Sequence, residues 1–273
     1  MRFSFILFSL LYSCAVFSAQ EYVVLDSTML ECIYNYKEID DTTNRSDYKE
    51  DMVMLRVGKQ ASVSFNMKMF YSDSLCNTPD GTKLWGQMMM QSIRSRNYDA
   101  MPRPSTSLNE YVYKNYPQGK TTVTDVLGVS HVQYEEENVL QEWLITDSLR
   151  QILGYMCQKA ECDFRGRHYV AWFTTEIPVG EGPWKFGGLP GLILEVYDSN
   201  KYFCFTAIGI KQNCRQPVCF YDFHDYRRVK RDSFIKARKK EGLIFDTQMG
   251  NLGLQVSGGA NNENRSPGNI EKY

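Results

Sequence analysis

Apolar and polar residues alternate with a period of two along most of this chain, and this alternation restricts its fold more than any other feature. Between residues 61 and 70, apolar Val63, Phe65, Met67 and Met69 alternate with polar Ser62, Ser64, Asn66 and Lys68. Such alternation is typical of a β-strand with one buried face. The sequence therefore predicts a strand across this whole segment.

Similar segments follow one another with tight turns between them, and two stretches have helical character instead. Consecutive short strands joined by tight turns favour an antiparallel sheet. We expect a mainly β (α+β) fold: a single curved antiparallel sheet or open half-barrel with a few helices. The further strands are predicted at residues 30–36, 52–57, 111–116, 121–127, 131–134, 140–145, 155–164, 168–175, 192–197 and 202–210, and the helices at residues 82–94 and within 223–240.

The N-terminus has the pattern of a secretory signal peptide. Arg2 precedes an apolar run from residue 3 to 17, and the small residue Ser18 fits a cleavage site. We expect residues 1–18 to be a signal peptide and residues 19–273 to form one domain, so that the mature protein is periplasmic, associated with the outer membrane, or secreted. An alternative is lipidation of Cys14, although Tyr12 is too large for its position in a lipobox. No later apolar run approaches the roughly twenty residues that span a bilayer.

The net charge and the cysteines indicate which partners and cross-links to expect. Loss of Arg2 changes 31 basic residues to 30 against 32 acidic ones, a net charge of −2, which gives no general attraction to nucleic acid. Seven of the eight cysteines would remain after cleavage, and export favours disulfides, with Cys214 and Cys219 as the most local pair. The cysteine spacings match no zinc site, and we expect no metal or other cofactor.

The segment Gly182-Pro183-Trp184-Lys185-Phe186-Gly187-Gly188-Leu189-Pro190-Gly191-Leu192-Ile193 combines flexible glycines, rigid prolines and large aromatic residues. Together with Leu153-Gly154-Tyr155, Cys157-Gln158-Lys159-Ala160 and Ala171-Trp172-Phe173-Thr174, it resembles the GLPGLI family of exported bacterial proteins. The resemblance makes Gly182, Pro183, Gly188, Pro190 and Gly191 the structural signature. It implies an envelope protein with no settled biochemical activity.

The resemblance also suggests a distant similarity to the open half-barrel of lipoprotein carriers, whose concave apolar face can hold a ligand. The leading interpretation is a binding, carrier or accessory protein for a hydrophobic ligand or an outer-membrane protein partner. Its contact residues would be Trp172, Glu176, Trp184, Phe186 and Leu189. The alternative is that these aromatic side chains only fill the open end of the sheet.

Two other functions remain as alternatives. The known hydrolase motifs are missing from the sequence, so no catalytic residue is assigned and an enzyme is the less favoured interpretation. A hydrolase would need dispersed carboxylates converging in a cleft, for example Glu176, Glu181 and Asp163. A Cu(I)-binding protein would use thioethers that share one face of paired strands, Met52 with Met54 and Met67 with Met69.

A basic stretch near the end of the chain offers a further contact surface. Residues 227–240 contain eight basic side chains and one acid, Asp232. Such a run usually forms a solvated helix face, but it can also rest on anionic headgroups. We expect any peripheral membrane contact to use Arg227, Arg228, Lys230 and Arg231.

Overall fold

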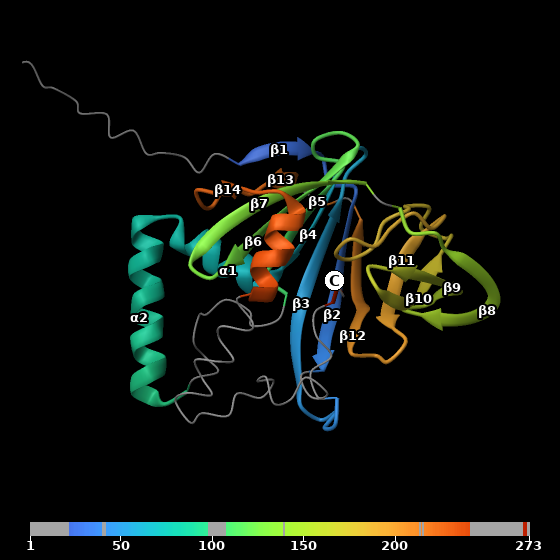
Figure 1. The fold of residues 1–273 in the computed structure, drawn as a ribbon, viewed down its shortest axis with the longest axis horizontal. Helices are drawn as coiled ribbons and strands as arrows, with labels where there is room; N and C mark the ends of the chain where they lie inside the picture. The colour runs from blue at the N-terminus through green and yellow to red at the C-terminus, as the bar shows by residue number, and fades with distance from the viewer. Residues whose placement is uncertain are drawn as a thin grey trace, which may run out of the picture.

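The computed structural model describes residues 22–39, 42–97, 108–138, 140–212, 214, 216–240 and 270–271. The expected signal peptide and Cys14 lie outside these residues. Within them, a large, strongly curved β-sheet occupies most of the molecule (Figure 1). The mainly β prediction is therefore confirmed.

The large sheet is open, because its two edges are different strands. Its neighbours are antiparallel throughout, except for the short parallel pair β14 and β7. In sheet order, its described strands are β14 (Arg227–Arg228), β7 (Ser130–Glu137), β6 (Lys120–Leu127), β5 (Tyr111–Lys114), β4 (Ser62–Asn66), β3 (Tyr48–Val57), β2 (Leu30–Ile39), β12 (Phe203–Gln212), β11 (Leu192–Asp198), β10 (Arg167–Thr174), β9 (Tyr155–Phe164) and β8 (Leu144–Ile152). A separate two-stranded sheet pairs β1 (Val23–Asp26) with β13 (Val218–Phe220).

Two α-helices, α1 (Met67–Cys76) and α2 (Pro79–Ser95), follow β4, and a third helix covers residues 231–240. The predicted strand at residues 61–70 is wrong beyond Asn66, where α1 begins. The Asn66 side chain accepts hydrogen bonds from the backbone N–H groups of Lys68 and Met69, at 2.8 and 3.3 Å. Asparagine caps helices well, and here the cap ends a pattern that reads as a strand.

The start of α1 at Met67 contradicts the arrangement of methionines that a Cu(I) site would need. Met67 and Met69 lie on the first turn of α1 and not on a strand paired with Met52 and Met54. Residues two apart on a helix point in different directions. The expected convergence of four sulfur atoms on one sheet face is therefore absent.

The disulfide prediction is also wrong for the described residues, in which all seven cysteines are free. Cys219 lies on β13 with a buried side chain. The Cys214 thiol instead donates to the backbone oxygen of Lys211 at 3.3 Å. The short sequence separation of Cys214 and Cys219 therefore does not bring their sulfur atoms together.

Both faces of the sheet are covered by apolar side chains. On the face that we call the inner face, one core cluster spreads from β7 through β2 to β10, and also includes Phe234 of helix 231–240. On the outer face, a second cluster joins β4 and β5 to β13, with Phe70 of α1 packed against it. The polar side of β4 is consequently buried as well, which the alternation alone does not predict.

Candidate functional site

The segment Gly180–Gly191, here called the signature loop, folds back on itself between β10 and β11. Glu181 and Gly187 form an isolated antiparallel bridge, and the Gly188 N–H donates to the Gly180 oxygen at 2.9 Å. Gly188 has φ +85°, a conformation that favours glycine. A Cβ on Gly191 would lie 2.0 Å from the Thr174 oxygen, so only glycine fits at this close approach.

A lysine from β5 holds the loop in this shape. The Lys114 ammonium group donates to the Glu181 carboxylate and the Gly182 oxygen, both at 2.8 Å, and to the Phe186 oxygen at 2.5 Å. A small cavity of about 90 Å³ lies beside the loop and is lined by residues that include Lys114, Glu181 and Gly188. Lys114 already has three acceptors, so its charge is committed to the loop itself.

Four of the five expected contact residues are buried members of the inner core cluster, and three of them belong to the signature loop. Trp184 is 1% exposed, Phe186 is 0% exposed and Leu189 is 3% exposed. The Phe186 ring packs edge-on against Tyr169, with a centroid distance of 4.8 Å. This placement favours the alternative in which the aromatic residues fill the curve of the sheet, although their role as contact residues stays a prediction.

The two expected contact residues outside the signature loop, Trp172 and Glu176, have different partners. Trp172 is 9% exposed and lies under the Arg150 guanidinium group, 4.2 Å from the ring centroid. Glu176 is exposed and accepts the Met156 N–H at 2.7 Å. The five residues therefore do not form one contact surface.

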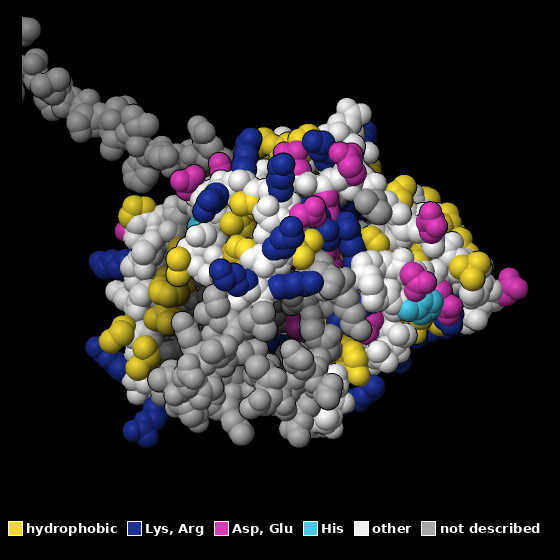
Figure 2. Space-filling view, viewed as in Figure 1, with side chains coloured by type: hydrophobic (Ala, Val, Ile, Leu, Met, Phe, Trp, Pro, Cys, Tyr) yellow, Lys and Arg dark blue, Asp and Glu magenta, His cyan; other side chains and the backbone are white. Residues whose placement is uncertain are grey.

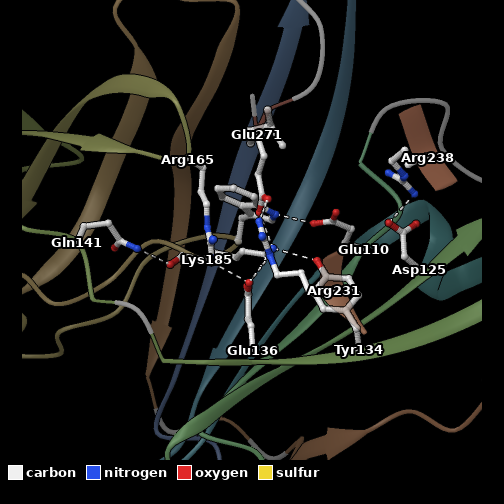
Figure 3. A network of polar contacts seen from close by, with 12 residues as sticks. Glu110, Asp125, Tyr134, Glu136, Gln141, Arg165, Lys185, Arg231, Arg238 and Glu271 are labelled. Atoms are coloured by element: carbon white, nitrogen blue, oxygen red, sulfur yellow. Dashed lines mark hydrogen bonds and ion pairs between the residues drawn. The ribbon is translucent and has the colours of Figure 1, made fainter. Parts of the chain in front are cut away.

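The signature loop instead places a lysine among buried charges (Figure 3). Lys185 follows Trp184, and its ammonium group lies 3.0 Å from the Tyr134 hydroxyl, 3.0 Å from a Glu136 oxygen and 2.5 Å from a Glu271 oxygen. Tyr134 and Glu136 both belong to β7, where they are two residues apart and so point to the same face.

Two arginines complete this group, which we call the Lys185 cluster. Arg231, the first residue of helix 231–240, pairs with Glu136 at 2.7 Å and with Glu271 at 2.5 Å. Arg165, in the turn between β9 and β10, pairs with Glu136 at 2.7 Å. Three cations thus face two carboxylates, and both carboxylates are largely buried.

Two further buried carboxylates lie near the Lys185 cluster. The Trp184 indole N–H donates to Glu110 at 2.6 Å, and Arg238 pairs with Asp125 at 2.6 Å. Burial raises the pKa of Glu110 to about 7, despite the opposing effect of Lys185. Burial also disfavours the charge on Lys185, but Tyr134 and Glu271 hold its pKa well above the ordinary value.

The cluster that the hydrolase alternative required does not form. Glu181 pairs with Lys114, and Glu176 accepts a backbone N–H. The side chain of Asp163 is 89% exposed and lies 2.9 Å from His168. Among the described residues, no group of three or more His, Cys, Asp or Glu side chains could hold a metal ion.

Sequence reasoning missed most of the Lys185 cluster. The one available signal was Lys185 itself, a charged residue within an otherwise apolar and glycine-rich motif. Arg231 was expected on the surface with Arg227, Arg228 and Lys230. The last three are exposed, whereas Arg231 is committed to two buried carboxylates.

Comparisons with known proteins agree with this fold and with the signature loop. Residues 165–195 match the family described as "Protein of unknown function (Porph_ging)", which is of the GLPGLI type. No curated protein matches the chain.

Two solved structures of PNGF-II are similar to the chain. The P21 structure has a TM-score of 0.51 with 14% identity over 78% of this chain, and the C2 structure has a TM-score of 0.49 with 16% identity over 78%. The matched region spans about a third of each PNGF-II chain, 34% and 33%. Because the identity is so low, the P21 likeness shows only that this large, open β-fold also occurs within PNGF-II.

Proposed function

We propose that the protein is an exported accessory protein of the cell envelope, of the GLPGLI type, that binds a partner protein and does not carry a hydrophobic ligand. The observation behind this proposal is the filling of the inner face by the protein's own side chains. Trp184, Phe186 and Leu189 of the signature loop and Phe234 of helix 231–240 belong to the same buried cluster as the strands. A carrier would need an open apolar cavity in their place.

Exposed apolar side chains at one edge of the sheet support a protein partner. On the edge strand β8, Ile145 is 43% exposed and Leu149 is 62% exposed, and on β9 Met156 is 52% exposed. Ile145 pairs with Ala160 and Leu149 with Gln158, so the register puts these three side chains on the same face of the sheet. Figure 2 shows hydrophobic side chains at this end of the molecule. Soluble proteins rarely expose large apolar patches unless these make contacts with other molecules.

Export and location remain proposals that depend on the sequence. The expected signal peptide, residues 1–18, supports a periplasmic, outer-membrane-associated or secreted protein. No helix among the described residues is long and apolar enough to cross a membrane. Arg227, Arg228 and Lys230 are exposed, and Figure 2 shows Lys and Arg side chains over this part of the surface, so we propose them for peripheral contact with anionic headgroups.

The test is to purify the protein from its native envelope and to identify co-purifying proteins and lipids by mass spectrometry. A partner protein in stoichiometric amount, with no retained lipid, is the expected result. A lipid held in stoichiometric amount would contradict the proposal, and so would a clean monomer without any partner.

A pair of matched variants locates the contact surface. Ile145→Ser together with Leu149→Ser should remove the partner while the protein stays folded, because both side chains are exposed on the same face of the sheet. Val129→Ser is the control, since Val129 is 99% exposed in the turn between β6 and β7. Equal recovery of the partner with both variants would exclude β8 as the contact surface.

A further inference from the structure

A short segment near the end of the chain, Ile270–Glu271, is buried in the middle of the molecule. Ile270 is 8% exposed and belongs to the inner core, and Glu271 is 3% exposed. In Figure 1 this end of the chain lies in front of the central strands. These two consecutive residues follow helix 231–240 after 29 others, and their side chains are as deeply buried as those of the core strands.

Each part of this dipeptide has a dedicated partner. The Ile270 side chain packs into the inner core, and the Ile270 backbone oxygen accepts the Tyr169 hydroxyl at 2.6 Å. The two Glu271 carboxylate oxygens lie 2.5 Å from Lys185 and 2.5 Å from Arg231, one oxygen for each cation. The inner core thus contacts the Ile270 side chain, Tyr169 binds the main chain, and two cations bind the Glu271 carboxylate.

The charges of the Lys185 cluster make this site selective for a carboxylate. With Glu271 in place, Lys185, Arg165 and Arg231 face Glu136 and Glu271. Without Glu271, the same three cations would face Glu136 alone within the cluster. Since buried charges need partners, the empty site would attract an anionic group, and a neutral side chain of similar shape would not satisfy it.

We infer that these residues form a peptide-recognition site for an apolar residue followed by an acidic residue, occupied by Ile270–Glu271 of the same chain. We call it the dipeptide socket. It is built by β7, β10, the signature loop and the start of helix 231–240. The inference is independent of the partner-binding proposal, because it concerns the inner face and not the β8 edge.

The experiment separates the dipeptide from the socket. A protein truncated after Arg265 is titrated with the synthetic peptide Ser-Pro-Gly-Asn-Ile-Glu-Lys-Tyr, residues 266–273, by isothermal titration calorimetry. The peptide should bind with 1:1 stoichiometry. A peptide carrying Glu271→Gln should bind about 30-fold more weakly or worse, since removing one partner of a buried charge pair has effects of this size. A peptide carrying Ile270→Ser should also bind about 30-fold more weakly, because it loses a buried apolar side chain.

Full-length proteins keep the inference testable if the truncated protein does not fold. The full-length protein carrying Glu271→Gln should bind the wild-type peptide, because its own segment competes less well, whereas the unaltered full-length protein should not. A full-length Lys120→Gln protein is the matched control, since that exposed lysine pairs with Glu135 on the surface and should leave peptide binding as in the unaltered protein. Equal binding of the Glu and Gln peptides, or no binding of the wild-type peptide by the Glu271→Gln protein, would overturn the inference.

Sedimentation tests which chain supplies the dipeptide. The full-length protein should sediment as a monomer with or without the Glu271→Gln change. A dimer that this change dissociates would overturn the assignment of the dipeptide to the same chain.

Discussion

Replacement of Lys185 by methionine tests whether the buried charges of the signature loop stabilise the fold. Methionine has nearly the same length as lysine but lacks the ammonium group, so Lys185→Met removes three contacts at once and leaves little empty space. The lost partners are Tyr134, Glu136 and Glu271. Lys185 is 8% exposed, so water cannot readily replace the missing charge.

The expected loss of stability follows from the partners that remain. Removing one member of a buried ion pair costs about 3 to 5 kcal/mol, because the other member keeps its desolvation cost. Glu136 and Glu271 both retain Arg231, and Glu136 also retains Arg165, so we expect the lower end, about 3 kcal/mol. For a domain of this size, such a loss lowers Tm by about 6 to 12 °C.

The assay is thermal and urea unfolding of the protein, followed by circular dichroism. Lys120→Met is the matched control, because Lys120 pairs with Glu135 on the surface, where both side chains are about 40% exposed (43% and 37%). Surface pairs contribute about 0 to 1 kcal/mol, so this variant should change Tm little. If Lys185→Met lowers the free energy of unfolding no more than Lys120→Met does, the reasoning about buried charge is refuted.

Three further predictions concern other parts of the structure. Burial raises the pKa of Glu110 from 4.5 to about 7, so the native state holds this proton more tightly than the unfolded state. The free energy of unfolding should therefore fall as pH rises from about 4.5 to 7. Glu110→Gln should remove this pH dependence, and an unchanged pH profile in urea unfolding would contradict the prediction. Burial lowers the pKa of His131 below 6.5, and the charge of the neighbouring His224 adds to this effect, while Asp73 opposes it. The contribution of His131 therefore has the opposite sign to that of Glu110, and stability should be lost as pH falls below 6.5. His131→Phe should flatten the pH profile of stability in this region, and an unchanged profile below pH 6.5 would disprove the assignment. Gly191→Ala should prevent stable folding, because the new Cβ would meet the Thr174 oxygen. Gly86→Ala has open space on α2 and should stabilise the protein by up to about 1 kcal/mol. Equal Tm values for the two variants would refute the steric argument.

Much of the sheet was predictable because its strands carry the alternation that a half-buried strand requires. The β9–β10 and β11–β12 hairpins match their predicted segments closely, since turns with asparagine or glycine separate alternating runs. Asn66 marks the limit of this method. The alternation continues past it, yet its side chain caps a helix, and the capping bonds outweigh a pattern that fits either structure for a few residues.

The candidate site was less predictable, because its parts come from distant places in the chain. Lys185 and Glu271 are 86 residues apart, and Lys185 and Tyr134 are 51 apart. No local spacing links them, so only the three-dimensional fold brings them together. Arg231 shows the same limit, since a run of basic residues does not reveal that its first helical member points toward the sheet.

Breaking the Lys185 cluster is costly, but compared with a fully apolar core the cluster contributes selectivity more than stability. An apolar group of the same volume often stabilises a core as well as a buried ion pair does, because each buried charge loses its hydration. An all-apolar socket, however, would accept almost any hydrophobic segment. Lys185 and Arg231 impose a second requirement, a carboxylate directly after the apolar residue, and that requirement distinguishes Ile270–Glu271 from the other hydrophobic segments of the chain.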